Sequence, residues 1–196
     1  MSDIMFKITH SKIMFPDVEM TTGEKVGIYA NNPDELFHNL LKIIIKPKKY
    51  TEEYVLEGME AENLSYFSRR IFHVVSADLW NEKNIYKLIK NKPENRKIMI
   101  LLIKENEIDL KNIVDISIYI EKNLSQENIL VITNSKDFLE AVCDRVIDIN
   151  GNAIELEEGT FIKRLDNMEE IENINEIEEK YVPLILKKRE LNVRGI

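Results

Sequence analysis

Side chains that commonly act as bases, nucleophiles or zinc ligands are scarce in this sequence, which has three histidines and one cysteine. None of His10, His38 and His73 pairs with Cys143 or with another histidine at a spacing typical of zinc sites. Cys143 lies at an expected helix-to-strand junction, where a small buried thiol is a simpler interpretation than a nucleophile. His73 lies in an expected strand and is interpreted as a structural residue. The sequence therefore predicts no catalytic residue and no metal ligand.

Glycine is the residue from which loops that hold phosphate groups are built, because its backbone can approach the phosphate closely. The chain has only six glycines. None of them is followed by Lys-Ser or Lys-Thr, which excludes an intact phosphate-binding P-loop. The six positions are Gly23, Gly27, Gly58, Gly151, Gly159 and Gly195.

The charged residues argue against a nucleic-acid partner, because the formal net charge is -8. Lys46, Lys48 and Lys49 form a small basic cluster, but Tyr50 is the only aromatic residue within it. Trp80 is interpreted as a packing residue, with an exposed anchor for a partner as the alternative.

Length and hydropathy favour one domain with an appendage, because the chain has 196 residues. Its 44% of apolar residues are sufficient for a sizeable core. There is no apolar run of about 20 residues and no signal peptide, so we expect no direct membrane insertion. A single cysteine excludes internal disulfides and favours a cytoplasmic location.

The first element that could position a phosphate site is the segment 24–30, EKVGIYA, which predicts a short buried strand. Asn32 can cap the helix that follows, Pro33 suits its first position, and Glu35 can complete a capping box. Apolar residues then recur at helical spacing, so we expect a helix over 34–45 that packs one face on a sheet.

The rest of the pattern alternates between strands and helices, which predicts an α/β sandwich with a largely parallel sheet. The segment 98–103 shows no polar alternation and is expected to be covered on both faces. Asn150-Gly151 predicts a hairpin between the last two strands. The further expected strands are 71–75, 98–103, 128–132, 145–149 and 153–157, and the further expected helices are 82–91, 109–122 and 135–142.

The sequence divides into an α/β core over 1–165 and a C-terminal tail over 166–196. The tail begins with an acidic stretch that carries apolar residues at three- and four-residue steps as far as Tyr181, which predicts an amphipathic helix. Two interpretations remain open: a helix docked on its own domain, or an arm that binds a partner or a second copy. The apolar positions are Met168, Ile171, Ile174 and Ile177.

Several segments, taken in order, resemble the ATPase domain of ABC transporters, especially the exporter branch. TTGEKVGIYA with LLKIII resembles the Walker A strand and helix, and NLSYFSRRIFHVVSAD resembles the Q-loop segment. RKIMILLIKENEIDL is similar to the Walker B strand and D-loop, and NILVITN is similar to the strand before the switch histidine. CDRVIDINGNAIELEEGT is similar to the terminal hairpin. The resemblance covers residues 4–165 and implies a P-loop NTPase-like three-layer sandwich.

The family ligand is ATP-magnesium, and the resemblance implies that its binding is lost here. ANNPDELF stands at the phosphate loop without glycine or lysine, so Asp34 and Glu35 would meet the phosphates with negative charge. Asp109 either matches the D-loop aspartate or simply caps a helix. Too few residues precede Gly23 for the usual first strands, which leaves Phe15 as a weak candidate for the adenine-stacking aromatic.

The other ATPase positions also depart from the family pattern. Ser76 stands at the Q-loop glutamine, and Asn134 stands at the switch histidine. The Walker B acids fall near the Ile103–Glu105 stretch, where Glu105 can match the catalytic glutamate only if Lys104 replaces the magnesium ligand. We therefore expect neither catalytic nor cofactor-binding residues.

The family's helical subdomain and its Leu-Ser-Gly-Gly-Gln signature normally lie between two segments that NKPENR joins here, at 91–96. The resemblance implies that an ATP-bridged dimer and ordinary docking on a membrane subunit are both compromised. The expected function is a non-catalytic binding or regulatory module with a protein partner, either a second copy or a transport component. One alternative is a nucleotide-binding subunit that works only with a competent ATPase, and a second is a small α/β enzyme with an unrecognised site.

Overall fold

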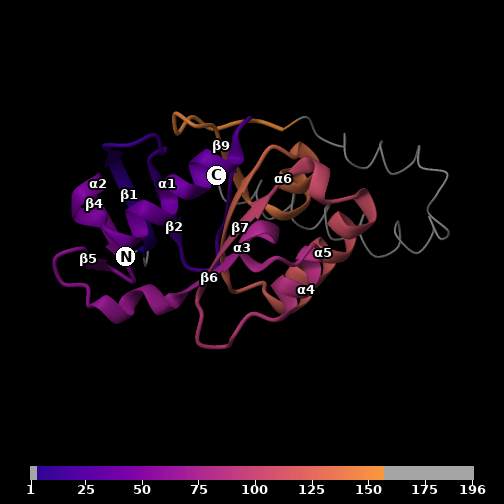
Figure 1. The fold of residues 1–196 in the computed structure, drawn as a ribbon, viewed down its shortest axis with the longest axis horizontal. Coiled ribbons are helices and arrows are strands. Elements are labelled where there is room, and N and C mark those ends of the chain that lie inside the picture. The colour runs from indigo at the N-terminus through magenta and orange to yellow at the C-terminus, as the bar shows by residue number, and fades with distance from the viewer. Residues whose placement is uncertain (1–3, 157–196) are drawn as a thin grey trace, which may run out of the picture.

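The computed structural model describes residues 4–156 and is built around a five-stranded parallel sheet (Figure 1). The strand order is β6-β7-β8-β3-β9. Every residue of β7 and β8 is buried, because helices or a second sheet cover both faces. The predicted α/β class with a largely parallel sheet is confirmed. The strands are β3 (Lys25–Tyr29), β6 (Phe72–Val75), β7 (Ile98–Ile103), β8 (Asn128–Thr133) and β9 (Arg145–Ile147).

One face of this sheet packs against helix α1 (Pro33–Ile45), which is followed by the short α2 (Pro47–Tyr50). An antiparallel sheet in the order β2-β1-β4-β5 packs against the same hydrophobic core. This one cluster contains the fully buried side chains of Ile100 from β7, Leu40 from α1 and Phe6 from β1. The strands are β1 (Ile4–Ser11), β2 (Val18–Thr21), β4 (Thr51–Leu56) and β5 (Met59–Glu60), and the 3-10 helix η1 (Tyr66–Ile71) leads into β6.

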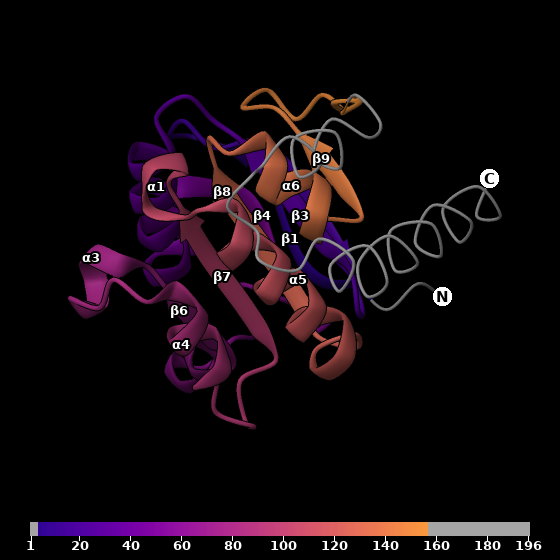
Figure 2. The ribbon, with the colours of Figure 1, turned by 90° about the vertical axis from the view of Figure 1, so that its right-hand side faces the viewer.

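The opposite face carries α4 (Ile85–Lys90), α5 (Leu110–Asn123) and α6 (Lys136–Val142) (Figure 2). Alternate residues of the central strands point to the two faces: Ile98 belongs to the α1 side and Met99 to the α5 side. The described residues therefore form three layers, with the parallel sheet in the middle, as the predicted sandwich requires. The short α3 (Ala77–Trp80) and the 3-10 helix η2 (Glu105–Glu107) lie at the carboxyl ends of β6 and β7.

The expectation that too few residues precede Gly23 for the first strands is wrong. β1 pairs with both β2 and β4 in antiparallel registers. Its side chains alternate, because Phe6 and Ile8 are buried while Lys7 forms outward ion pairs with carboxylates of the two neighbouring strands. The segment before Gly23 is therefore long enough to supply two strands of a second sheet.

The expected strand 153–157 is wrong over its described part, because only one bridge, between Ile147 and Ala153, forms. The Asn150-Gly151 turn is present, with Gly151 at a φ of 83°. Asp148 accepts hydrogen bonds from the backbone N–H groups of Asn150 and Asn152, at 2.8 and 2.9 Å, and these bonds hold a loop instead of a regular two-residue hairpin. Hydrogen bonding from Asn152 lowers the pKa of Asp148.

The expected helix 82–91 begins later than predicted. Asn81 is left-handed, with a φ of 50°, and closes α3 at its carboxyl end. The side chain of Asn84 then accepts a hydrogen bond from the Lys87 N–H at 2.9 Å and caps α4. Two asparagines therefore divide this stretch into two short helices. The core boundary at 165 and the whole tail over 166–196, including Met168, Ile171, Ile174 and Ile177, lie outside the described residues.

Candidate functional site

The carboxyl edge of the parallel sheet is where α/β proteins of this architecture bind ligands. The connection from β3 to α1 at this edge is only three residues long, at 30–32. Its first residue, Ala30, donates its backbone N–H to the Thr133 carbonyl at 3.0 Å, which ties the connection to the end of β8. This connection is too short and too closely held to wrap around a phosphate group.

The start of α1 differs from the predicted capping box. The Asn32 side chain makes no cap hydrogen bond, although Pro33 occupies the first turn as expected. Instead, the Asn32 amide donates to the Glu35 carboxylate at 3.3 Å. Pro33 has no N–H to be satisfied, and Asp34 and Glu35 supply the first turn with negative charge. The helix start is thus stabilised by its own carboxylates, by a route other than the predicted cap.

A lysine occupies the centre of this edge. Lys104 is the first residue after β7, and its Nζ lies 2.8 Å from Asp78, 2.9 Å from Glu107 and 3.7 Å from Asp34. The three carboxylates come from α3, η2 and α1, so segments distant in the sequence converge on one ammonium group. We call Lys104, Asp34, Asp78 and Glu107 the lysine cluster.

Hydrogen bonding to Asp78 raises the pKa of Lys104 above its usual range, and hydrogen bonding to Glu107 adds a smaller effect in the same direction. The ammonium group is therefore charged throughout the physiological pH range. With three carboxylates around one cation, the cluster is negative overall. It is a partly exposed ion network around one ammonium group, and the protonated Lys104 has no lone pair with which to act as a base.

The two other positions singled out at this edge stabilise loop ends. Ser76 is 2% exposed, and its hydroxyl accepts the Leu79 N–H at 3.4 Å, at the start of α3. Asn134 accepts the Glu105 N–H through its side-chain oxygen at 2.8 Å, which links the ends of β8 and β7. Glu105 itself is exposed.

Asp109 is the N-cap of α5, where it accepts the Asn112 N–H at 2.7 Å, as expected of a helix start. Phe15 is 6% exposed within the core cluster beside α1, so its ring is a packing element. The other aromatic singled out from the sequence behaves differently: Trp80 is 54% exposed, and its Nε1 donates to the Val74 carbonyl at 2.7 Å.

Cys143 is buried at the end of α6, and His73 is half-buried in β6. The His73 Nε2 donates to the Leu88 carbonyl at 3.2 Å and so connects β6 with α4. Desolvation, with smaller effects from Lys92 and Arg96, lowers the pKa of His73. Within residues 4–156, no three His, Cys, Asp or Glu side chains are arranged to hold a metal ion.

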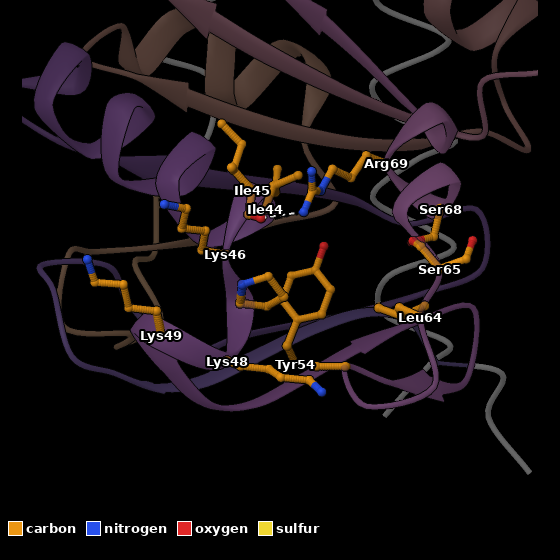
Figure 3. A pocket seen from close by; sticks show the side chains of 12 residues that line it. Ile44, Ile45, Lys46, Lys48, Lys49, Tyr54, Leu64, Ser65, Ser68 and Arg69 are labelled. Atoms are coloured by element: carbon orange, nitrogen blue, oxygen red, sulfur yellow. Dashed lines mark hydrogen bonds between the residues drawn. The ribbon is translucent and has the colours of Figure 1, made fainter.

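A second feature is a groove of about 470 Å³ on the α1 side of the molecule (Figure 3). We call it the basic groove. Its apolar surface comes from the end of α1, from β4 and from the segment before η1, and its rim carries four cations. Burial raises the pKa of Tyr54, whose ring stands in the middle of the groove. The apolar surface includes Ile44, Ile45, Tyr54 and Leu64, and the rim is formed by Lys46, Lys48, Lys49 and Arg69.

Sequence reasoning identified Lys46, Lys48 and Lys49 but missed Arg69, and it identified Asp34 and Lys104 but missed Asp78 and Glu107. Each missed residue belongs to a segment that only the fold brings next to the identified ones. The position of Asp78 carried a usable signal, since it follows the expected strand 71–75 and therefore had to lie at the carboxyl edge of the sheet.

Comparison with known proteins gives a likeness of fold. No protein-family model matches this chain, and no curated protein matches its sequence. Among solved structures, the chain is similar to CbiO1 from Clostridium perfringens, which is part of the ABC transporter complex CbiONQ. The TM-score is 0.54 at 13% identity, over 95% of this chain and 99% of that chain. No helix in the described part of our chain is both long and apolar enough to cross a bilayer. The chain therefore has the P-loop NTPase-like fold of an ABC transporter ATPase, with a lysine cluster at the carboxyl edge of its sheet.

Proposed function

We propose that this chain is a non-catalytic, ABC-ATPase-like module that binds or regulates a protein partner in a transport system, in the cytoplasm. The observation that carries the proposal is the lysine cluster, in which Lys104 is held by three carboxylates at the edge where nucleotide would bind. The likeness to a component of an ABC transporter complex supports the link to transport.

The residues at the phosphate position do not fit a polyphosphate. A phosphate site at a helix start needs open N–H groups and a cation, as in P-loop proteins. Here Asp34 and Glu35 occupy the first turn of α1, and the side chain of Asp34 lies 3.7 Å from the Lys104 ammonium. An incoming phosphate would meet these two carboxylates, and Lys104 is already paired with Asp34, Asp78 and Glu107.

The residues at the magnesium position do not fit a metal ion either. Magnesium in such sites is held by oxygen ligands that include a carboxylate and the nucleotide phosphates. The residue directly after β7 is a lysine, whose ammonium group already lies within ion-pair distance of all three nearby carboxylates. A divalent cation would have to take these carboxylates from Lys104, and the positive charge of the ammonium group would repel it.

The connection between α4 and β7 supports a nucleotide-independent role. Only residues 91–97 separate these elements. The family resemblance places a helical subdomain and the ATP-contacting signature at this point. We therefore propose that any self-association of this chain is independent of ATP.

The decisive experiment is a titration of the purified protein with ATP-magnesium, in which calorimetry and the fluorescence of Trp80 detect binding. The chain has one tryptophan, and it lies in the same short helix as Asp78 of the lysine cluster. We expect no saturable signal up to millimolar nucleotide and no phosphate release, with a competent ABC ATPase as the positive control. Saturable micromolar binding would contradict the proposal and favour a nucleotide-binding subunit that works with a competent partner.

Two further results distinguish the non-catalytic module from a small α/β enzyme with an unrecognised site. A phosphate-release rate that disappears with a point substitution in this chain would favour a small α/β enzyme. Co-purification with a membrane transporter, without intrinsic turnover, would favour the module. Installing a glycine-rich loop and a lysine at 30–37 is expected not to restore turnover, because Ser76 and Asn134 remain in place.

A further inference from the structure

The basic groove combines an apolar surface with three exposed lysines on its rim. Ile44 and Tyr54 are 7% and 4% exposed at its base, while Ile45 is 50% exposed at its edge. Together these side chains give the groove an apolar surface of the kind that ligand-binding grooves have. The groove lies between the end of α1 and η1, with the Arg69 side chain reaching across to the Ile45 carbonyl (Figure 3).

The three lysines of the rim make their side of the groove positive. Lys46, Lys48 and Lys49 are exposed, and no carboxylate among the described residues lies within ion-pair distance of them. Lys49 instead stands 5.1 Å from the centre of the Tyr50 ring. The whole chain has a net charge of -8, so this local positive surface contrasts with the rest of the molecule. It fits a segment that is both acidic and apolar.

The chain itself contains such a segment. Residues 166–180 carry seven carboxylates and one lysine, with apolar side chains at three-residue steps. A sequence of this kind, folded as a helix, presents one apolar stripe with acidic flanks, which is the pattern that helix-in-groove binding uses. The stripe matches the groove surface, and the flanks match the lysine rim.

The position of the described chain end favours a second copy over the chain's own segment. Ile154 and Leu156 pack on the α5 and α6 side of the parallel sheet, whereas the groove belongs to the α1 side. The ten residues from 156 to 166 span at most about 35 Å when fully extended. Half the circumference of a domain of this size, with a radius of gyration of about 15 Å, is on the order of 60 Å.

We infer that the basic groove binds the acidic segment 166–180 of a second copy of this chain, so that two copies exchange these segments in a symmetric dimer. Each groove receives the segment of the other copy, as a two-fold interface requires. This contact uses neither the lysine cluster nor nucleotide. Because both sides of the contact are charged and partly exposed, the dimer weakens as the salt concentration rises.

Light scattering of the full chain tests the inference with three variants. The groove variant is Lys46→Glu with Lys49→Glu, and the segment variant is Ile171→Asp with Ile174→Asp. The matched control, Lys87→Glu with Lys90→Glu, reverses two exposed lysines of α4 on the other side of the sheet. We expect the wild type and the control to be dimers at low salt. The groove variant reverses four charges per dimer and should dimerise roughly 100-fold more weakly.

Mixing the groove variant with the segment variant gives the sharpest result. The groove variant still offers a normal segment, and the segment variant still offers a normal groove, so one intact contact should form and a mixed dimer should appear. Circular dichroism establishes that each variant is folded. A monomeric wild type, a groove variant that dimerises normally, or a segment variant that dimerises normally would each overturn the inference.

Discussion

At the scale of single residues, Lys104 decides the chemistry of the carboxyl edge. Lys104, the first residue after β7, places its ammonium group 3.7 Å from the carboxylate of Asp34 at the start of α1. Asp78 and Glu107 contact the same ammonium group at 2.8 and 2.9 Å. One lysine thus links the first turn of α1 to α3 and η2 at the carboxyl edge of the sheet.

The first prediction concerns this lysine. Lys104→Met leaves Asp78, Glu107 and Asp34 facing one another without a cation, so the free energy of unfolding should fall by about 1 kcal/mol, a modest loss because Asp78 is exposed. The loss should shrink at high salt, where the carboxylates repel one another less. Urea denaturation at low and high salt measures both effects. Lys87→Met, which removes a single exposed ion pair with Glu82, is the control and should cost less.

The second prediction concerns His73. Its pKa is lowered in the folded protein by desolvation, so below about pH 6.5 the unfolded chain binds more protons than the folded one. The stability that His73 contributes is therefore present above this pH and is lost as the pH falls toward the folded pKa. His73→Gln keeps a donor for the Leu88 carbonyl but cannot titrate, so stability should depend less on pH between about pH 7 and pH 5. An unchanged slope would contradict the assignment, and His38→Gln, on the exposed side of α1, is the control.

At the scale of elements, α6 packs directly against the central sheet. Gly27 of β3 faces this helix, and a Cβ at that position would lie 2.3 Å from the Leu139 Cδ2 and 2.9 Å from the Cys143 Sγ. The sequence marked Gly27 only as a residue outside any phosphate loop. The structure gives it a different role, because the absence of a side chain lets α6 pack directly on β3.

The third prediction follows from this packing. Gly27→Ala should lower the free energy of unfolding by about 1–3 kcal/mol, because the added methyl group overpacks the interface between β3 and α6. Denaturation followed by circular dichroism measures the loss. Combining Gly27→Ala with Leu139→Ala should cost less than the sum of the two single substitutions, because the methyl group then enters vacated space. Strict additivity would show that the two side chains do not compete.

The elements of the parallel sheet were predictable because buried parallel strands have a plain signature. The segments 98–103 and 129–132 are continuous apolar runs, and helical spacing marks α1 and α5. The antiparallel sheet was missed because β4 follows directly after α2, with no separating turn. At the site, Asp34 and Lys104 could be placed by resemblance to known segments. Glu107 could not, because its role depends on how η2 turns after β7.

At the scale of the whole molecule, the two sheets share one core. Phe6 of β1 is 0% exposed and meets two rings edge-on, that of Tyr54 in the antiparallel sheet at 5.7 Å and that of Phe72 in the parallel sheet at 5.6 Å. α1 lies in the same cluster as both sheets. The antiparallel sheet is thus joined to the parallel sheet through buried aromatic contacts, and the two should unfold as one cooperative unit.

The fourth prediction tests this unity. Phe6→Ala removes the ring that joins the two sheets and should lower the free energy of unfolding by about 3–5 kcal/mol, the usual cost of an aromatic ring lost from a core. Trp80 lies beyond β6, at the far edge of the parallel sheet, and reports on that sheet alone. If the sheets share one core, its fluorescence transition should shift by the same amount as the circular dichroism of the whole chain.

Met59→Ala, which truncates an exposed side chain of β5, is the control and should change the free energy of unfolding from either transition by no more than about 0.5 kcal/mol. A Phe6→Ala protein in which Trp80 keeps its original midpoint, while part of the dichroism is lost earlier, would show two separate folding units instead.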